Sequence, residues 1–231
     1  MEKMISEQMK TEYENSIVRQ NLLNWISFQA GETFLYKRTL CQSMQDYLRQ
    51  QGVLIEEWDS QTKKSYDYIM LMEDILSKEP FLLTDEILLE CQEKLSGDGR
   101  VLIAMNNPMG MRYWSGAAED TTGEAYVGLE GVFHDNNLPT YSRKTLSLLF
   151  DRCGMKAEFY YPMPDYIFPT EIFSDEYLPE QGDIRGKSPA YFGQNYVMFR
   201  ENLVYDKVCK DGLFPYFANS FLVIASKEKS E

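Results

Sequence analysis

The sequence predicts an α/β domain built around a mostly parallel β-sheet. One strand–helix–strand unit between residues 66 and 105 carries this prediction. Tyr66–Met72 (YDYIMLM) is short and nearly all apolar, which is typical of a strand buried on both faces of a parallel sheet. Thr84–Leu95 has the apolar spacing of a helix, and Val101–Met105 is a second buried strand. Since parallel units of this kind are almost always right-handed, we expect a right-handed crossover.

Several shorter elements are expected before this unit. Residues 1–15 resemble a helix of low apolar content, and a short amphipathic helix begins at Ser16. Thr33–Lys37 (TFLYK) is a strand candidate because aromatic and β-branched residues dominate it. Leu40–Gln51 is a helix that Gly52 ends, as glycine commonly does beyond a helix terminus. A short strand over residues 53–55 follows.

Turns and long loops separate the later elements. Ser96–Gly99 is expected to be a turn, and residues 106–140 and 162–190 to be long irregular segments. The ordered elements of this half are one helix and two strands: Lys144–Cys153, Lys156–Pro162 and Asn219–Ser226.

The composition favours a well-packed core and argues against two classes of partner. Of the 231 residues, 44% are apolar and 14% aromatic, which is enough for the core of one large domain. The net charge is −13, and such a surface repels phosphate backbones and anionic lipid. We therefore expect no nucleic-acid partner. No apolar stretch approaches the roughly 18 residues that cross a bilayer, so we expect no membrane span.

The start of the chain and its metal-binding residue types indicate a cytoplasmic protein without a metal site. Met1–Asn15 is polar and charged and has no secretory signature. The single histidine, His134, excludes a His-rich site. The cysteines are scattered without a C-x-x-C pair, as expected for reduced thiols: Cys41, Cys91, Cys153 and Cys209.

Five segments of the chain resemble a known enzyme superfamily. Gly97–Met105 (GDGRVLIAM) is similar to the "pGGrlliai" strand of class I S-adenosylmethionine-dependent methyltransferases. The others resemble a bacterial subgroup whose members are similar to methyltransferase modules found with glycosyltransferases in surface-polysaccharide assembly: residues 106–123 (NNPMGMRYWSGAAEDTTG), 140–146 (TYSRKTL), 160–179 (YYPMPDYIFPTEIFSDEYLP) and 212–225 (GLFPYFANSFLVIA). The resemblance covers about residues 66–226. It implies a Rossmann-like three-layer fold with an antiparallel last strand, and S-adenosylmethionine as the cofactor.

The chain is expected to form one methyltransferase-like domain over residues 1–231. Residues 1–30 are its N-terminal helical segment, 31–105 a shortened Rossmann-like core, and 106–231 the substrate-side loops and C-terminal strands. The core is called shortened because the superfamily has two strands between its cofactor loop and the central strand. Only Val53–Trp58 is available here, so a strand and a helix are missing.

The cofactor loop departs most from the superfamily. There, a strand ends in E/D-x-G-x-G-x-G, because the backbone must turn tightly and approach the cofactor without a Cβ in the way. The matching segment Phe34–Cys41 has no glycine. Tyr36, Lys37 and Arg38 would fill the space in which the methionine and ribose normally lie. We therefore expect impaired binding of S-adenosylmethionine.

The catalytic residues stay unknown. The subgroup carries a histidine within "EDHTG", where this chain has Thr121, so Glu119 or Asp120 would have to act as a base with a tuned pKa. The acid that binds the ribose likewise has no secure counterpart among Glu56, Glu57 and Asp59.

Candidate site residues lie in the segments that leave the carboxyl ends of the strands, where open parallel sheets bind ligands. The cofactor candidates are Tyr36, Asp59, Met72 and Glu73, and the substrate candidates are Asn106, Asn107, Tyr113, Trp114, Glu119 and Asp120. Alternatives stay open for three pairs. Glu73 and Asp74 either lie at the edge of the substrate or cofactor site or begin a solvated loop. Asn106 and Asn107 either bind substrate or form a turn. Tyr113 and Trp114 either stack on a sugar or cap the core.

Two functions from different classes remain open. In the first, the chain is a pseudoenzyme that keeps its fold for ligand binding or assembly in cell-surface glycan biosynthesis. In the second, it is an active S-adenosylmethionine-dependent methyltransferase that holds its cofactor by atypical contacts and acts on a sugar or glycan-linked substrate. The missing glycines favour the first. As partners we expect a small-molecule or glycan ligand, and a protein partner or a second copy of the chain.

Overall fold

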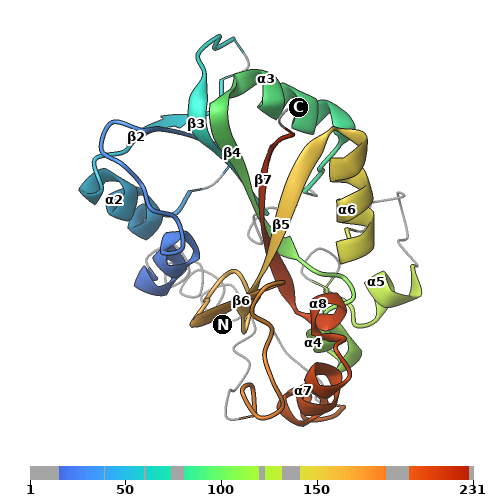
Figure 1. Cartoon of the computed structure of the whole chain (residues 1–231). Helices are drawn as coiled ribbons and strands as arrows, with labels where there is room; N and C mark the ends of the chain where they lie inside the picture. The colour runs from blue at the N-terminus through green and yellow to red at the C-terminus, as the bar shows by residue number, and fades with distance from the viewer. Residues whose placement is uncertain are drawn as a thin grey trace.

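A seven-stranded sheet forms the centre of the molecule, in the order β2-β1-β3-β4-β7-β5-β6 (Figure 1). The computed structural model describes residues 16–38, 40–59, 61–73, 81–119, 123–131, 141–185 and 198–228. The neighbours from β2 to β4 pair in parallel, whereas β7 lies antiparallel between β4 and β5. The predicted Rossmann-like α/β fold with an antiparallel last strand is confirmed.

The strands are short at both edges of the sheet and longer at its centre. Their bounds are β1 Thr33–Lys37, β2 Leu54–Glu57, β3 Tyr66–Met72, β4 Leu95–Asn106, β5 Met155–Met163, β6 Glu171–Ser174 and β7 Ser220–Lys227. Among the described residues, β2 is the only strand between β1 and β3. This agrees with the shortened N-terminal half that the sequence predicts.

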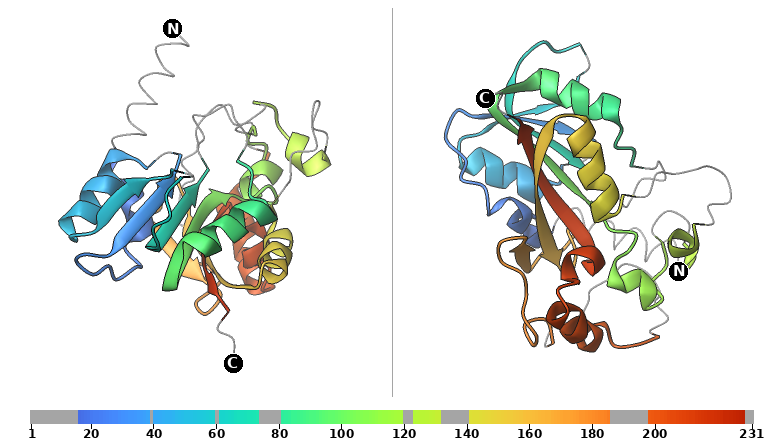
Figure 2. Two further views of the ribbon diagram at one scale, coloured as in Figure 1. Left: turned by 90° about the horizontal axis from the view of Figure 1, so that it is seen from above. Right: turned by 45° about the vertical axis from the view of Figure 1, so that its right-hand side comes forward.

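Helices cover both faces of the sheet, which gives three layers. Figure 2 shows α2 on one side of the sheet and α3 with α6 on the other. The helix bounds are η1 Ile17–Leu23 (a 3-10 helix), α2 Gln42–Gln50, α3 Asp85–Lys94, α4 Met111–Trp114, α5 Val127–Glu130, α6 Arg143–Arg152, α7 Glu201–Lys210 and α8 Phe214–Phe217. In the described part of the chain, no helix has the length and apolar character needed to cross a membrane.

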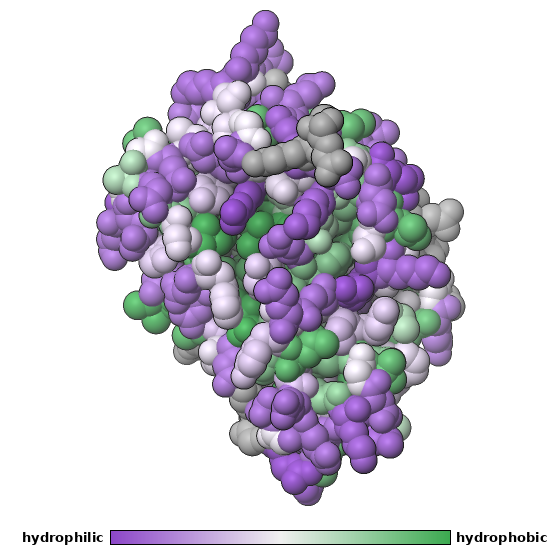
Figure 3. Space-filling view, viewed as in Figure 1, coloured by the Kyte–Doolittle hydropathy of each residue, from purple (hydrophilic) through white to green (hydrophobic). Residues whose placement is uncertain are grey.

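The alternation of side chains along β3 divides the core into two clusters. Tyr68, Met70 and Met72 pack on the face covered by η1 and α2, whereas Ile69 and Leu71 pack on the face covered by α3 and α6. This follows from the two-residue repeat of a strand. In the view of Figure 3, apolar side chains gather near the middle, over the strands between α2 and β5, and hydrophilic residues surround them.

Three expectations about secondary structure are corrected. Ser96–Gly99 is no free turn but an irregularity inside β4, because Tyr66 pairs with Leu95 while Tyr68 pairs with Arg100. The loop predicted over residues 106–140 contains α4 and α5. The segment predicted as irregular over 162–190 contains β6, which forms a ladder with the end of β5. The turn-forming residues in these segments gave no local signal for helices or strands, although tertiary contacts stabilise such elements there.

Candidate functional site

The first strand ends without a glycine turn. Tyr36 stays in the sheet, opposite Glu57 of β2 and Met70 of β3, and its carbonyl accepts a hydrogen bond of 2.8 Å from the Trp58 backbone N–H. Arg38 then follows with a φ of 73°, in the left-handed region that favours glycine. The turn toward α2 is therefore made by a residue that carries a full side chain.

Two ammonium groups approach one indole beside this turn. Lys37 Nζ lies 4.7 Å from the ring centroid of Trp58, and Lys94 Nζ lies 5.4 Å from it. Lys94 also donates a hydrogen bond of 2.8 Å to the carbonyl of Thr62. Cation–π contacts of this kind fix the position of a positive charge against an aromatic face. The ends of β1 and β2 thus carry packed side chains on the side of α3.

A cavity of about 190 Å³ opens next to these side chains. Its lining comes from the end of β1, from β3, and from the start of α3 with the residues before it: Lys37, Arg38, Leu71, Phe81, Leu82 and Ile87. The cavity therefore lies at the carboxyl ends of two adjacent parallel strands. That is the part of an open α/β sheet where ligands bind.

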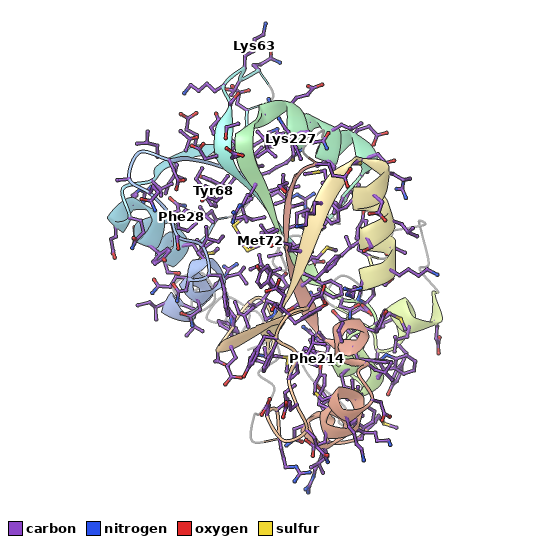
Figure 4. The ribbon with its side chains drawn as sticks, in the orientation of Figure 1. Phe28, Lys63, Tyr68, Met72, Phe214 and Lys227 are labelled. Carbon is purple, nitrogen blue, oxygen red and sulfur yellow. The ribbon has the colours of Figure 1, made fainter. Side chains whose placement is uncertain are left out.

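Met72 and Glu73 lie at the end of the central strand, as predicted. The buried guanidinium of Arg19, from η1, donates to Met72 Sδ over 3.6 Å. The carboxylate of Glu73 accepts a hydrogen bond of 2.8 Å from the backbone N–H of Asn106. Glu73 thereby joins the ends of β3 and β4, while its carbonyl accepts from the Tyr166 hydroxyl at 3.1 Å. Figure 4 shows Met72 among the side chains at the centre of the molecule.

The Asp59 carboxylate makes a hydrogen bond within its own loop. Its Oδ1 accepts a hydrogen bond of 2.9 Å from the backbone N–H of Gln61, which is the local contact that short acidic side chains make in turns. The ribose-binding role suggested for Asp59 stays a prediction. Glu56, one of the two acids of β2, accepts hydrogen bonds from Lys64 and from the Tyr66 hydroxyl, and these hydrogen bonds hold the pKa of its carboxyl below the usual value.

The two asparagines after β4 are built into the protein. Asn107 is fully buried, and its Nδ2 donates to the carbonyls of Tyr216 at 2.9 Å and Ala218 at 2.7 Å. Its Oδ1 accepts from the Met109 N–H at 3.0 Å, as in the turn alternative. These bonds hold the segment after β4 against α8 and the residues that lead into β7.

A buried ion pair lies beside Asn106. Arg112 and Asp165 have side chains only 1% and 2% exposed, and their charged groups are 4.0 Å apart. Arg112 Nη1 also donates to Asn106 Oδ1 over 3.5 Å, and Asp165 Oδ1 accepts from the backbone N–H groups of Ile167 and Phe168. Sequence reasoning missed this pair. Its only signal was a charged residue within the apolar run MGMRYW.

The remaining candidate residues include both buried and exposed side chains. Tyr113 is 1% exposed and belongs to the core, whereas Trp114 is 42% exposed, and its Nε1 donates to the Met109 carbonyl at 3.2 Å. The carboxylate of Glu119 lies so close to Gly128 that a Cβ there would collide with it. Asp74, Asp120, Thr121 and His134 lie outside the described residues.

The thiols of Cys91 and Cys209 are too weakly acidic to act as nucleophiles. Burial raises the pKa of Cys91 to about 12 and that of Cys209 to about 11, so both are protonated near neutral pH. Within the described residues, no three metal-ligating side chains come together. The described side chains at the carboxyl ends of the strands include cations, a carboxylate, amides and apolar walls.

The comparisons with known proteins rest on structure alone. No protein-family model matches the sequence, and no curated protein matches it. A chain from the complex of the Haloferax volcanii Trm112 methyltransferase activator with a protein assigned as a methyltransferase superposes with a TM-score of 0.54. The two chains are 12% identical, and the match covers 100% of this chain and 96% of the other. This chain has the Rossmann-like methyltransferase fold.

Two further structures with this fold are more distant. An S-adenosylmethionine-dependent methyltransferase from Archaeoglobus fulgidus has a TM-score of 0.49 and 13% identity, covering 96% of this chain and 99% of that one. A TehB-like S-adenosylmethionine-dependent methyltransferase from Corynebacterium glutamicum has a TM-score of 0.46 and 11% identity, covering 98% and 97%. The bacterial polysaccharide-associated subgroup stays a prediction from the sequence segments.

Proposed function

We propose that this chain is a pseudoenzyme with the methyltransferase fold, which has lost the ordinary S-adenosylmethionine site and acts by binding a ligand or in assembly. The observation that carries the proposal is the end of β1. Tyr36, Lys37 and Arg38 stand where the superfamily has glycines, and Arg38 makes the turn with a left-handed backbone.

Steric and electrostatic arguments support this proposal. A glycine loop lets the backbone approach the cofactor closely, and any Cβ at those positions prevents that approach. S-adenosylmethionine also carries a positive sulfonium. Lys37 and Arg38 line the neighbouring cavity, so a cationic methyl donor beside them meets like charges at short range.

The alternative is an active methyltransferase with atypical cofactor contacts, acting on a sugar or glycan-linked substrate. One observation favours it: hydrogen bonds of Asn107, Arg112 and Asn219 hold the segment after β4 in place. The Oδ1 of Asn219 accepts from the backbone N–H of Arg112 at 2.9 Å. A role in surface-glycan biosynthesis rests on sequence resemblance. A protein partner has a precedent in the activator complex among the similar structures.

A thermal-shift titration of the whole chain with S-adenosylmethionine and S-adenosylhomocysteine tests the proposal. A ligand present at one hundred times its Kd stabilises a folded protein by about 2.7 kcal/mol. We expect no shift at millimolar concentrations of either compound. A methyltransferase known to bind the cofactor serves as the positive control, and circular dichroism shows that the chain is folded. A saturable increase in Tm would contradict the proposal.

A further inference from the structure

We propose that the pocket between η1 and β6, called here the Trp25 pocket, binds a neutral sugar ring. Asn21, Asn24 and Trp25, at the end of η1 and just beyond it, form one wall, and residues 169–172 around the start of β6 form the other. This inference rests on the ligand-binding part of the proposed function and deepens it, because it gives the ligand a site and a chemical class.

Hydrogen bonds join the two walls of the pocket. Asn21 Nδ2 donates to the Pro169 carbonyl at 2.9 Å, between residues 148 positions apart in the sequence. Asn21 Oδ1 accepts from Asn24 Nδ2 at 3.1 Å, which fixes the Asn24 side chain beside it. The two elements lie side by side in Figure 1 and in the right-hand view of Figure 2. The rim of the pocket is therefore formed before a ligand arrives, which lowers the cost of binding.

The position and size of the pocket suit a small ligand. Met163, at the carboxyl end of β5, pairs with Glu171 of β6. Both β4 and β5 run antiparallel to β7, so β5 ends at the same edge of the sheet as β4 does. Open α/β sheets bind ligands at that edge. The volume of about 350 Å³ lies near the lower end of the range of roughly 300–1,000 Å³ for small-molecule sites, as expected for one ring.

The Trp25 side chain offers an aromatic surface to this pocket. Its ring centroid lies 6.1 Å from that of Tyr160, at an interplanar angle of 41°, yet the side chain is 51% exposed. The contact with Tyr160 restricts the indole and leaves half of its surface open to solvent. A pyranose ring has a face of C–H groups, and its packing on the indole removes apolar surface of both partners from water.

The polar groups around the indole suit hydroxyl groups. A sugar hydroxyl both donates and accepts hydrogen bonds, and a side-chain amide and a threonine hydroxyl do the same. Asn24 and Thr170 are exposed residues of the pocket lining. The Asn24 amide uses one N–H in its bond to Asn21, and no described residue takes the other. An apolar face bordered by such groups matches a sugar ring, which has an apolar face and a rim of hydroxyls.

The charge of the pocket favours a neutral ligand. Its described lining contains no lysine, arginine or histidine, and the chain has a net charge of −13, so an anion finds no counter-charge there. An organic cation is the other class that an exposed indole binds. Glu171, the charged residue of the described lining, already interacts with another group of the protein. The observations therefore favour a sugar over a cation.

Isothermal titration of the whole chain with the methyl glycosides of glucose, galactose, mannose and N-acetylglucosamine tests the proposal. Sorbitol is the control that has hydroxyls but no ring face, and cyclohexanol is the control that has a ring but no rim of hydroxyls. We expect saturable binding of at least one glycoside at one site per chain. Each control should bind at least about tenfold more weakly, because it lacks one of the two sets of contacts.

Choline tests the cationic alternative in the same titration. The proposal is overturned if none of the four glycosides binds, or if sorbitol, cyclohexanol or choline binds as tightly as the best glycoside does.

Variants locate the site. Trp25→Ala removes the aromatic face and should weaken binding of the best glycoside about tenfold. Asn24→Ala removes one amide of the rim and should weaken it about fivefold. Tyr177→Ala is the matched control, because Tyr177 is an aromatic residue that is 72% exposed and lies outside the pocket lining. We expect this variant to bind like the parent chain, and circular dichroism shows that each variant is folded.

Trp114→Ala completes the set, because Trp114 is another exposed tryptophan, outside the pocket lining. If Trp25→Ala binds the glycoside as the parent chain does, the Trp25 pocket is not the site. Loss of binding in Trp114→Ala, with binding kept in Trp25→Ala, would place the sugar beside α4 instead and overturn the proposal.

The outcomes separate this inference from the proposed function. A chain that binds both a glycoside and S-adenosylhomocysteine would contradict the loss of the cofactor site and leave the Trp25 pocket in place. A folded chain that binds neither the glycosides nor S-adenosylhomocysteine would overturn the Trp25 pocket alone.

Discussion

Arg38 shows how one residue can shape the end of a strand. Its φ of 73° places an arginine in a region that costs an ordinary L-residue about 1–2 kcal/mol. The missing glycines were visible in the sequence, but the left-handed turn was not, because nothing in the letters YKRT indicates a positive φ.

Replacing Arg38 with glycine and with alanine separates backbone strain from side-chain contacts. Both changes remove the guanidinium, but only glycine relieves the left-handed conformation. Arg38→Gly should therefore have a free energy of unfolding about 1 kcal/mol higher than that of Arg38→Ala. Urea unfolding measures the difference. An alanine variant that is as stable as the glycine variant would show that the turn is unstrained.

Cys91 gives a pH-dependent prediction. Burial disfavours its thiolate and raises its pKa to about 12, whereas the unfolded chain ionises near the ordinary value of 9.0. The folded chain thus binds more protons above pH 9, so stability is complete below that pH and falls as the pH rises toward 12. Cys91→Ala should remove up to about 1.4 kcal/mol per pH unit of this slope. Parallel slopes for the variant and the parent chain between pH 9 and 11 would contradict the prediction.

At the scale of elements, the sequence predicts best where apolar patterns are continuous. The strands β1, β3 and β7 and the helices α3 and α6 begin within two residues of their expected starts. Thr84, the first residue of the predicted helix, caps α3 by accepting from the Ile87 N–H at 3.3 Å. The helix α7 was missed although Tyr205 and Val208 have helical spacing. No element was predicted between residue 190 and Asn219.

The candidate site could be predicted only in part, because some of its contacts join residues that are far apart in the sequence. The carboxyl ends of adjacent parallel strands meet at one edge, so Glu73 and Asn106 could be expected to lie together, and they do. The contact between Arg19 and Met72 joins residues 53 positions apart through the packing of η1. No local pattern predicts such a contact. Long-range polar contacts of this kind have to be read from the structure.

The buried pair of Arg112 and Asp165 should matter more than a surface pair of the same type. Arg112→Ala leaves a buried carboxylate without its counter-charge, and the expected loss is about 3 kcal/mol of unfolding free energy. Arg152→Ala is the matched control. It breaks an exposed pair with Asp85, for which we expect little change because solvent screens the charges. Urea unfolding compares the two variants, and equal losses would show that the buried pair contributes no more to stability than the exposed pair does.

For the whole molecule, the fold and the proposed loss of cofactor binding depend on different parts of the sequence. The sheet order, the antiparallel β7 and the helices on both faces are those of the methyltransferase fold. These features depend on apolar patterns spread over the whole chain, which is why the sequence predicts them. In the superfamily that the sequence resembles, the cofactor site depends on a few glycines at the end of one strand, and the sheet of this chain forms without them.

The central claim is that this fold no longer holds S-adenosylmethionine at the end of β1. Isothermal titration of the whole chain with S-adenosylhomocysteine tests it most directly, because that compound keeps the adenosine and amino-acid groups while lacking the sulfonium charge. We predict no binding heat beyond dilution at millimolar concentrations. A saturable isotherm with one site per chain, lost when Tyr36 or Arg38 is substituted, would contradict the account.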